Sequence, residues 1–308
     1  MLFARAKKPA WYALSESGGQ AVIARLQRTP GEAPRLLQLS REALPVPGAG
    51  RAGLKRAHHL ERYRGLTLLP HDSYRFLKTE TPDVPETELA EAMRWRIKDQ
   101  LDYPVEEAAI QVLPIPADPA PGRQASAFVV AARTEAVRDL VQDFQKDGLP
   151  LDVIDVRELA QRNLAHLFEE PERGLATLSV TPEGSLLTLT ANGELYALRQ
   201  IDIPLAALRD PDASRRTELF DRLTLELQRS LDSFDRQHGQ IPVARLVLLP
   251  MPDSDELHRY LVENLYLPVV AVDLADVLDA SAIPDFRSAE AQNQGLFAIC
   301  LALREVGA

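Results

Sequence analysis

Each half of this 308-residue chain opens with three short apolar segments, and this repeated order constrains the fold more than any single motif does. Runs of this length, separated by turn residues, are typical of antiparallel strands. After each set of three, longer amphipathic segments alternate with single apolar runs, as they do in α/β proteins. The sequence therefore predicts an α/β fold of two similar lobes, residues 1–168 and 169–308, with a cleft between them. The predicted opening strands are residues 11–14, 21–26 and 36–39 in the first half and 176–180, 185–190 and 194–201 in the second.

Turn signals and helical periodicity support this division of the chain. Residues 17–19, Ser-Gly-Gly, and residues 192–193, Asn-Gly, are typical of antiparallel hairpins, because glycine adopts the positive φ that tight turns need. Residues 85–101 and 217–234 each carry apolar side chains every fourth position, which predicts one amphipathic helix in each half. The apolar positions are Leu89, Met93, Ile97 and Leu101 in the first helix and Leu219, Leu223, Leu227 and Leu231 in the second, and Asp83 and Glu86 are the expected capping box of the first.

The charge of the chain argues against a nucleic acid as its partner. The formal net charge is −10, from 35 basic and 45 acidic side chains, and such a surface repels phosphate backbones unless basic residues cluster. Residues 51–64 are the most basic stretch, but Glu61 interrupts them, and we interpret them as a solvated loop. Residues 45–53 and 118–124, which are rich in proline, are also predicted to be loops.

The single cysteine and the distribution of apolar residues indicate a cytoplasmic protein. Cys300 excludes an intrachain disulfide and lies in the apolar run 295–303, so we expect a thiol packed in a buried helix. No segment approaches the ~18 consecutive apolar residues of a membrane span, and the N-terminus lacks the apolar stretch of a signal peptide. We therefore expect a protein that reaches a membrane only through a partner.

Common catalytic and metal-binding motifs are absent from the sequence. It contains no Gly-x-x-x-x-Gly-Lys-Ser/Thr, no Gly-x-Ser-x-Gly and no His-Glu-x-x-His. Of the six histidines only His58 and His59 are close in sequence, and adjacent residues project in different directions. We therefore expect no catalytic residue, no cofactor and no metal, and a protein that acts by binding other proteins.

Residues 69–116 carry a pattern that is similar to a known family. Residues 88–95 read Glu-Leu-x-x-Ala-x-x-Trp, and residues 103–106 read Tyr-Pro-Val-Glu. This pattern resembles the MshI family of pilus biogenesis proteins, which are relatives of PilM, and residues 128–133 and 229–234 are also similar to PilM-like sequences. The resemblance implies the two-lobed actin-like fold of FtsA and of the cytoplasmic part of the secretion protein GspL. It also implies a subdomain inserted in the first lobe at about residues 70–135.

The nucleotide-binding positions depart from the family pattern. PilM-like proteins open with Gly-x-Asp-x-Gly-Ser, begin a second phosphate loop with Asp-x-Gly, and end a later strand with paired glycines. Glycine lets the backbone approach a phosphate, and proline removes an N–H donor, so these replacements imply a pseudo-ATPase without a bound cofactor. The degenerate positions are Ala13 and Ser15, then Ser179 and Thr181 followed by Pro182, then Pro250 and Met251; the remaining candidates for a phosphate contact are Ser17, Gly18, Ser179 and Gly184.

The resemblance implies an adaptor or platform protein of a type IV, MSHA-like pilus assembly machine. Such a protein binds the cytoplasmic N-terminal segment of an inner-membrane partner of the PilN or MshJ kind, in a groove of the first lobe beside the insert. Self-association into a ring and contact with the assembly ATPase are further implied partners. The candidate partner contacts are Trp95 and Arg96 on the first predicted helix and Tyr103 after it, although Trp95 could equally cover the edge of the core.

Two alternatives stay open at this stage. The first is an ATP-binding, actin-like ATPase or sugar-kinase relative whose phosphate loops are non-standard. The second is a GspL-like cytoplasmic component of type II secretion. It ranks lower, because such a protein is expected to continue into a membrane span and this sequence ends at Ala308 without one.

Overall fold

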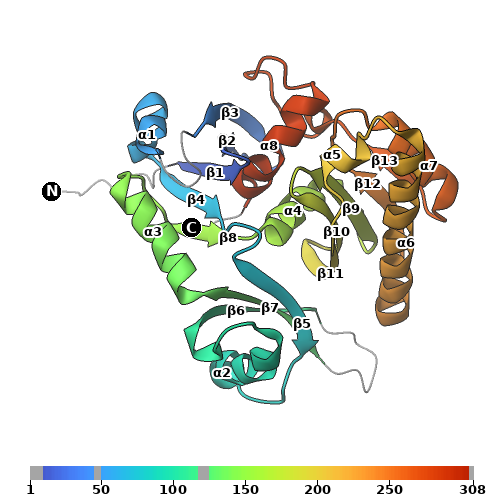
Figure 1. The fold of residues 1–308 in the computed structure, drawn as a ribbon, viewed down its shortest axis with the longest axis horizontal. Helices are drawn as coiled ribbons and strands as arrows, with labels where there is room; N and C mark the ends of the chain where they lie inside the picture. The colour runs from blue at the N-terminus through green and yellow to red at the C-terminus, as the bar shows by residue number, and fades with distance from the viewer. Residues whose placement is uncertain (1–9, 45–49, 117–124, 305–308) are drawn as a thin grey trace.

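The structure, a computed structural model, describes residues 10–44, 50–116 and 125–304, which form two large lobes and a smaller subdomain (Figure 1). Lobe I contains a five-stranded sheet in the order β3-β2-β1-β4-β8. Strand β2 is antiparallel to both of its neighbours, β1 and β3, whereas β4 and β8 continue the sheet in parallel with β1. The strands are β1 (Trp11–Ser17), β2 (Gln20–Gln27), β3 (Arg35–Ala43), β4 (Arg64–Leu68) and β8 (Val153–Asp155).

Lobe II repeats this topology. Its sheet has the order β11-β10-β9-β12-β13, in which each strand takes the place of its lobe I counterpart. The first three strands are again antiparallel, and β12 and β13 again run parallel to the first. The matching order confirms the predicted α/β fold of two similar lobes. The strands are β9 (Gly174–Thr181), β10 (Gly184–Ala191), β11 (Glu194–Ile201), β12 (Val243–Leu248) and β13 (Val269–Ala271).

A third sheet belongs to a subdomain that the chain forms between β4 and β8, which we call the insert (residues 69–133). Its strand order is β5-β7-β6. Helix α2 (Glu86–Ile97) covers one face of this sheet, and its fully buried Met93 and Ile97 pack with alternate residues of β7. The apolar stripe predicted for this helix therefore faces a core, as expected. The strands are β5 (Tyr74–Glu80), β6 (Ala108–Pro114) and β7 (Ser126–Arg133).

Helices α4 (Arg157–Ala165) and α8 (Ala289–Ala302) lie between the two large sheets (Figure 1). Their apolar side chains form one hydrophobic cluster with residues from both sheets, so the lobes share a core. Cys300 of α8 is fully buried in this cluster, and burial raises the pKa of its thiol. The prediction of a packed thiol in a buried helix is thus confirmed.

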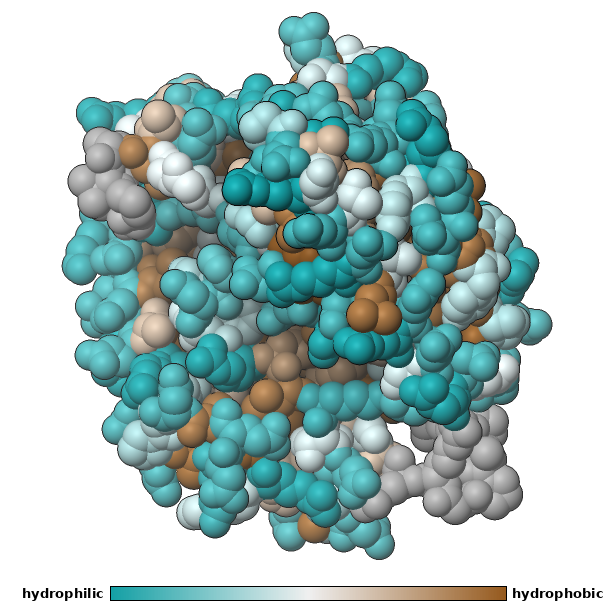
Figure 2. Space-filling view, turned by 45° about the vertical axis from the view of Figure 1, so that its right-hand side comes forward, coloured by the Kyte–Doolittle hydropathy of each residue, from teal (hydrophilic) through white to brown (hydrophobic). Residues whose placement is uncertain are grey.

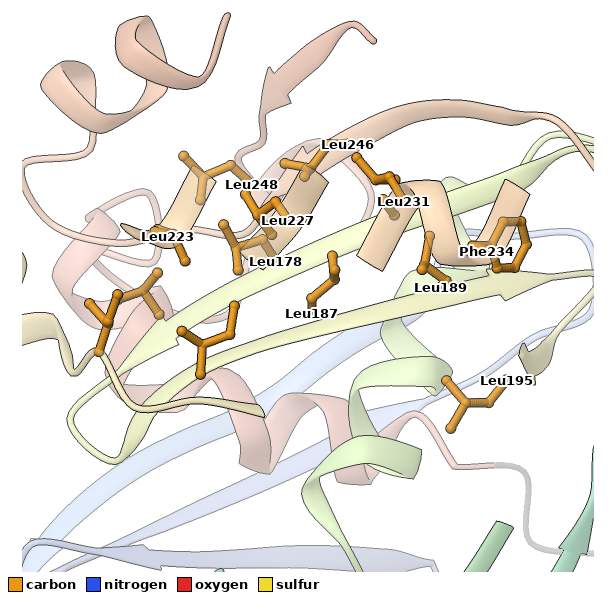
Figure 3. Close-up of a cluster of buried hydrophobic side chains, with 14 of the residues drawn as sticks. Leu178, Leu187, Leu189, Leu195, Leu223, Leu227, Leu231, Phe234, Leu246 and Leu248 are labelled. Atoms are coloured by element: carbon orange, nitrogen blue, oxygen red, sulfur yellow. The ribbon is translucent and has the colours of Figure 1, made fainter. Parts of the chain in front are cut away.

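Other helices cover the outer faces of the two sheets. On lobe II, Leu223, Leu227 and Leu231 of α6 (Ala213–His238) pack in one cluster with Leu178 and Leu246 of the sheet (Figure 3). This confirms the apolar seam predicted from periodicity. The remaining helices are α5 (Leu205–Leu208) and α7 (Asp255–Asn264) in lobe II, and α1 (Ala52–His58) and α3 (Thr134–Lys146), which contribute to a cluster on the outer face of lobe I.

Residues 51–64 are not the solvated loop that their charge suggested. They form α1 and a 3-10 turn at Leu60–Arg62, in which Leu54 and Leu60 are buried. Arg51, the first basic residue of the stretch, is only 2% exposed. The prediction was wrong because the carboxylate that neutralises Arg51 is far away in sequence and could not be identified from local composition. Of the two predicted loops, residues 52–53 are helical, whereas residues 45–49 and 118–124 lie outside the described residues.

Helix ends also differ from the sequence prediction. The N-cap residue of α2 is Pro85 and not Asp83, which the expected capping box requires at that position. The helix ends at Ile97, and a 3-10 turn at Lys98–Gln100 follows it. Helix α6 extends beyond residues 217–234 at both ends. It begins after Asp212, whose carboxylate caps it by accepting the Ser214 N–H at 2.9 Å.

Candidate functional site

Two hairpin turns, one from each lobe, face a common cavity in the cleft. In the β1–β2 turn, Gly18 and Gly19 have φ values of 55° and 77°, the positive values that the predicted hairpin requires. The β9–β10 turn consists of Pro182 and Glu183. Between the turns lies a space of about 230 Å³, which we call the turn cavity. It is lined by Ser15, Ser17 and Gly18 of lobe I, Thr181, Pro182 and Glu183 of lobe II, and Asn293, Gln294 and Phe297 of α8, among others.

A second space, which we call the main cavity, shares several of these lining residues and has a volume of about 510 Å³. It extends from the β1–β2 turn to the segment that enters the insert and to helix α3. Leu69 and Leu140 supply apolar lining, and Asp72 and Asp143 supply carboxylates. The cleft is therefore large enough for a small ligand or for part of a peptide.

The lobe II turn presents a carboxylate to both cavities. The hydroxyl of Thr181 donates a hydrogen bond to Glu183 Oε2 at 2.9 Å and lies 3.2 Å from the carbonyl oxygen of Gly184. Pro182, at the first position of the turn, has no backbone N–H. This turn therefore offers an incoming anion one donor fewer than an ordinary turn, and it places a negative charge beside the anion.

On the lobe I side, Glu16, another carboxylate of the main cavity, is paired with a buried arginine. Arg51 Nη2 donates to Glu16 Oε2 at 2.9 Å, and Arg51 Nη1 lies 3.8 Å from an oxygen of Asp147. The guanidinium also lies 4.8 Å from the centre of the Phe144 ring. Two carboxylates thus offset the charge of Arg51, which serves to hold α1 against β1.

Arg157 is different, because it forms no ion pair with the residues that the structure describes. It begins helix α4, and its guanidinium carbon lies 5.6 Å from the centre of the Phe297 ring. Its Nε atom is buried without an acceptor. Because its guanidinium lines the main cavity and carries a positive charge, this position favours a ligand that brings a carboxylate or phosphate oxygen to that cavity.

Comparison with solved structures identifies the fold. A chain of a PilM-PilN type IV pilus biogenesis complex is similar to this protein with a TM-score of 0.73 and 22% sequence identity, over 97% of this chain and 98% of that chain. The chain has an actin-like fold. The cytoplasmic domain of EpsL, an inner membrane component of the type II secretion system of Vibrio cholerae, is similar with a TM-score of 0.50 and 13% identity, over 79% of this chain and 83% of that chain.

Comparisons at the level of sequence are less informative. No protein-family model matches the chain, and no curated protein matches it either. Within residues 10–44, 50–116 and 125–304, no three histidine, cysteine or acidic side chains are grouped so that they could bind a metal ion. None of the helices in this described part of the chain is both long and apolar enough to cross a membrane.

The charge of the turn cavity disfavours a triphosphate that carries no bound cation. Actin-like folds that bind nucleotides use backbone N–H groups of such turns for the phosphates. Here a phosphate would meet the carboxylate of Glu183, and two like charges 4 Å apart repel by about 4 kcal/mol near a protein surface. Among the described lining residues of the turn cavity, none is basic. Arg157, which lines the main cavity, is the group that favours an anion there.

Several predicted phosphate positions contribute to the core instead. Ala13 is fully buried in β1. Ser179 is 1% exposed, and its hydroxyl donates to Gln161 Oε1 at 2.6 Å inside the lobe II sheet. Gly184 has a φ of 128° and pairs with Thr181 across the turn, and neither Ser179 nor Gly184 is among the residues that line the two cavities. Ser15, Ser17, Gly18 and Thr181 therefore lie together around the turn cavity. The candidates Ser179 and Gly184 do not line it.

The two positions that take the place of the paired glycines, Pro250 and Met251, are buried in the protein. Met251 is 2% exposed and belongs to the core of lobe II. Pro250 is also buried, and its carbonyl oxygen accepts a hydrogen bond from Asn293 Nδ2 at 2.9 Å. The same amide nitrogen donates to the carbonyl oxygen of Val180 at 2.8 Å. Asn293 thus ties the ends of two lobe II strands together from α8.

The three candidate partner contacts lie on or after helix α2 of the insert. Trp95 is 52% exposed, and its indole N–H donates to Glu91 Oε1 at 3.0 Å. Arg96 is exposed, and its Nη1 lies 3.8 Å from a carboxylate oxygen of Glu80 at the end of β5. Trp95 is not among the described side chains that pack in the cluster between α2 and the insert sheet, and half of its surface faces solvent.

Tyr103 has a different environment from the two α2 residues. It is half-buried, and the guanidinium carbon of Arg133 lies 4.2 Å from the centre of its ring. Burial raises the pKa of its hydroxyl. None of Trp95, Arg96 and Tyr103 is among the lining residues of the main cavity, so the α2 surface and the cleft are two separate candidate sites.

Sequence reasoning missed a buried carboxylate at the point where the insert, α4 and lobe II meet. Glu158 is 0% exposed, and its Oε2 accepts the hydroxyl proton of Tyr74 in β5 at 2.8 Å. Its Oε1 accepts from the side-chain amide of Gln200 in β11. Burial and the Glu158 carboxylate raise the pKa of Tyr74. The partners of Glu158 are 84 and 42 residues away, so no local pattern could have revealed this junction.

Proposed function

We propose that this protein is an adaptor of a type IV pilus assembly machine, which binds the cytoplasmic N-terminal segment of a PilN-like or MshJ-like inner-membrane protein and does not hydrolyse ATP. It would belong to the MshI family, reside in the cytoplasm, and reach the membrane through that partner. The observation that carries the proposal is the similarity to a chain of a PilM-PilN complex over almost the whole length of both chains.

The cleft and the α2 surface support this role in different ways. The rebuilt turns, with Pro182 and Glu183 at one tip, disfavour a triphosphate, which argues for binding without turnover. The exposed indole of Trp95 has the character of an interface anchor, because aromatic side chains supply much of the binding energy at protein surfaces. The resemblance of the segment around Trp95 to the MshI pattern adds to this interpretation.

Binding of the partner segment is the direct test of the proposal. A synthetic peptide with the cytoplasmic N-terminal sequence of the candidate partner should bind with micromolar affinity in isothermal titration calorimetry. Trp95→Ala should weaken binding about tenfold. Removal of an aromatic side chain that becomes buried in an interface costs at least about 1.4 kcal/mol of binding free energy. Tyr266→Ala removes a side chain that is 68% exposed on lobe II and should leave the affinity unchanged. No heat of binding with the wild-type protein would contradict the proposal.

Mg-ATP should not stabilise the protein against heat. A site with a dissociation constant of about 50 µM would add about 2.7 kcal/mol to the free energy of unfolding at about 5 mM nucleotide. For a protein of this size that energy raises Tm by several degrees, whereas we expect a shift below about 1 °C in differential scanning fluorimetry. Magnesium chloride alone serves as the control.

A divergent nucleotide-binding protein is the second candidate function, and Arg157 is the observation that favours it. Its unpaired guanidinium and its Nε without an acceptor suit an anionic ligand. If Mg-ATP does raise Tm, Arg157→Ala should abolish the increase. A rise in Tm with Mg-ATP that is lost in Arg157→Ala would show that the protein binds nucleotide. The proposal that it is a pseudo-ATPase without a bound nucleotide would then be wrong, whether or not the protein hydrolyses ATP.

The similarity to the EpsL cytoplasmic domain keeps a secretion-system role as a third candidate. It covers a smaller share of this chain than the pilus complex does. The two machines are distinguished by the partner, so the same calorimetric titration with a peptide from a type II secretion protein decides between them. Tight binding of that peptide, with none of the pilus peptide, would favour secretion.

A further inference from the structure

A groove separate from the cleft lies between the insert and lobe II, and we call it the side groove. It has a volume of about 510 Å³. Its walls are β5 and β7 of the insert on one side and β11 and α6 of lobe II on the other. Lys78 Nζ donates to Gln237 Oε1 at 2.9 Å and so links the two walls. Figure 2 shows the hollow above the insert, with apolar residues on its floor and polar residues around it.

The floor of the side groove is aromatic. The rings of Phe76 and Phe128 lie with their centres 5.2 Å apart, and Phe234 of α6 lines the groove beside them. Phe128 and Phe234 are almost completely buried, whereas Phe76 is half-buried. A partly exposed aromatic side chain on an aromatic floor favours contact with an apolar side chain of a ligand.

The rim of the side groove is basic, although the protein as a whole has a net charge of −10. The sequence shows no cluster of basic residues here, because the four that line the groove come from three elements that only the fold brings together. One carboxylate, Glu226, lies among them. Such a local reversal of charge attracts acidic ligands. The basic lining residues are Lys78 of β5, Arg199 of β11, and Arg229 and Arg236 of α6.

The acidic residue in the groove does not neutralise all of these charges. A single carboxylate, Glu226, serves both Arg199 at 2.6 Å and Arg229 at 3.4 Å. Lys78 forms no ion pair with residues in the described part of the chain, and burial lowers the pKa of its ammonium group. A carboxylate from a ligand would therefore gain favourable interactions along the rim.

The backbone of β11 adds a second kind of recognition. This strand is an edge of the lobe II sheet, and Ala197, Leu198 and Arg199 in its middle line the groove. An edge strand presents N–H and C=O groups that an extended peptide can pair with, and alternate side chains of that peptide then point to the same side. The groove is thus suited to an extended segment.

We propose that the side groove binds an extended acidic segment of a partner protein, which pairs with the edge of β11, places an apolar side chain on Phe76 and sets carboxylates against Lys78 and Arg229. The inference does not rest on the proposed function, since the groove shares no residue with the α2 surface or with the main cavity. A helix would leave the edge of β11 without hydrogen-bond partners, so an extended conformation is preferred.

Selection from a random peptide library tests this inference, because such a library offers acidic, neutral and basic segments alike. The probe is a phage-displayed library of peptides of about twelve residues, long enough to pair along a strand. Selection uses the full-length protein, with counter-selection on the empty support. We expect the enriched peptides to be acidic and to contain an aromatic or large aliphatic residue flanked by carboxylates.

Affinities of the enriched peptides are then measured by fluorescence anisotropy. Arg229→Glu should weaken binding about tenfold, because it replaces attraction by repulsion at the rim. Arg222→Glu is the matched control, since it makes the same charge change at an exposed position of α6 outside the groove, and it should change the affinity less than about twofold. In a peptide paired with β11, the backbone N–H groups of alternate residues point towards β11 and the others point away. N-methylation of the first set should therefore abolish binding, whereas N-methylation of the second set should not.

Three results would overturn the inference. The first is an enriched set that is neutral or basic, or no enrichment at all. The second is equal loss of affinity with Arg229→Glu and Arg222→Glu, which would reflect overall charge. The third is a dimer of the unliganded protein in multi-angle light scattering that Arg229→Glu dissociates, because the groove would then be covered by a second copy of this chain.

Discussion

Gly65→Ala is expected to lower the free energy of unfolding by about 3–5 kcal/mol, which is more than the ~1–3 kcal/mol that overpacking a core typically costs. A Cβ atom on Gly65 would lie 2.0 Å from the carbonyl oxygen of Pro150 and 2.7 Å from the hydroxyl of Tyr12. The first is backbone and the second is a fully buried side chain, so neither can move without a shift of β1 or β8. Because native stability is typically about 5–15 kcal/mol, much of the protein should unfold or aggregate.

Chemical denaturation followed by circular dichroism measures this effect, with Gly53→Ala as the control. Gly53 lies in α1, and a Cβ atom there would meet nothing within 4 Å. Because alanine is the better helix former, this change should stabilise the protein by about 0.5–1 kcal/mol. Equal effects of the two substitutions would show that the close approach at Gly65 is not required.

The approach at Gly65 matters for the cleft because it fixes the strand that carries the first turn. The hydroxyl of Tyr12 in β1 donates to the Pro150 carbonyl at 2.5 Å, and the Gly65 N–H donates to Asp152 at 3.0 Å. A side chain at position 65 would separate these groups. The β1–β2 turn would then move relative to Glu183, and the main cavity would change shape.

The features that the sequence predicted correctly are those that depend on residues close together in the chain. Apolar side chains every fourth residue defined α2 and α6, because each turn of a helix repeats its buried face. Alternating strands and turns defined the two sheets, and the Asn192-Gly193 and Gly18-Gly19 turns have the positive φ that glycine permits. The resemblance around Trp95 then added the actin-like fold, which periodicity alone could not supply.

Groups whose partners lie far away in sequence could not be predicted. Arg51 was interpreted as part of a loop, because its partner is distant in sequence. The carboxylate of Glu16, which accepts a hydrogen bond from Arg51, lies in β1. The basic rim of the side groove could not be predicted from the sequence for the same reason. Lys78 and Arg229 belong to different lobes and are brought together only by the fold. Burial of a charge depends on tertiary neighbours, and composition along the chain does not report them.

Glu158→Ala is expected to lower the free energy of unfolding by about 3 kcal/mol and to loosen the insert. The substitution leaves the Tyr74 hydroxyl without its acceptor in a buried position and removes the contact to Gln200. Loss of a hydrogen bond to a charged group costs about 1.5–3 kcal/mol, and the small cavity left by the side chain adds to this. Glu135→Ala, which removes an exposed glutamate from the first turn of α3, should cost less than about 1 kcal/mol.

Hydrogen exchange separates local loosening from a general loss of stability. If Glu158 joins the insert to lobe II, the amides of β5 should exchange faster in Glu158→Ala, whereas those of β12, in the middle of the lobe II sheet, should change only with global stability. Uniform acceleration across both strands would contradict a joint at this position.

The pH dependence of stability gives a second measurement of the same junction. The folded state keeps the proton of Tyr74 above pH 10, where the unfolded chain releases it, because burial and the Glu158 carboxylate raise the pKa of the hydroxyl. Stability should therefore fall by about 1.4 kcal/mol per pH unit above pH 10 on account of this residue, and Tyr74→Phe should remove that part of the slope. Since β5 and β11 form the two walls of the side groove, a loosened junction should also weaken any peptide bound there, even though neither Glu158 nor Tyr74 lines the groove.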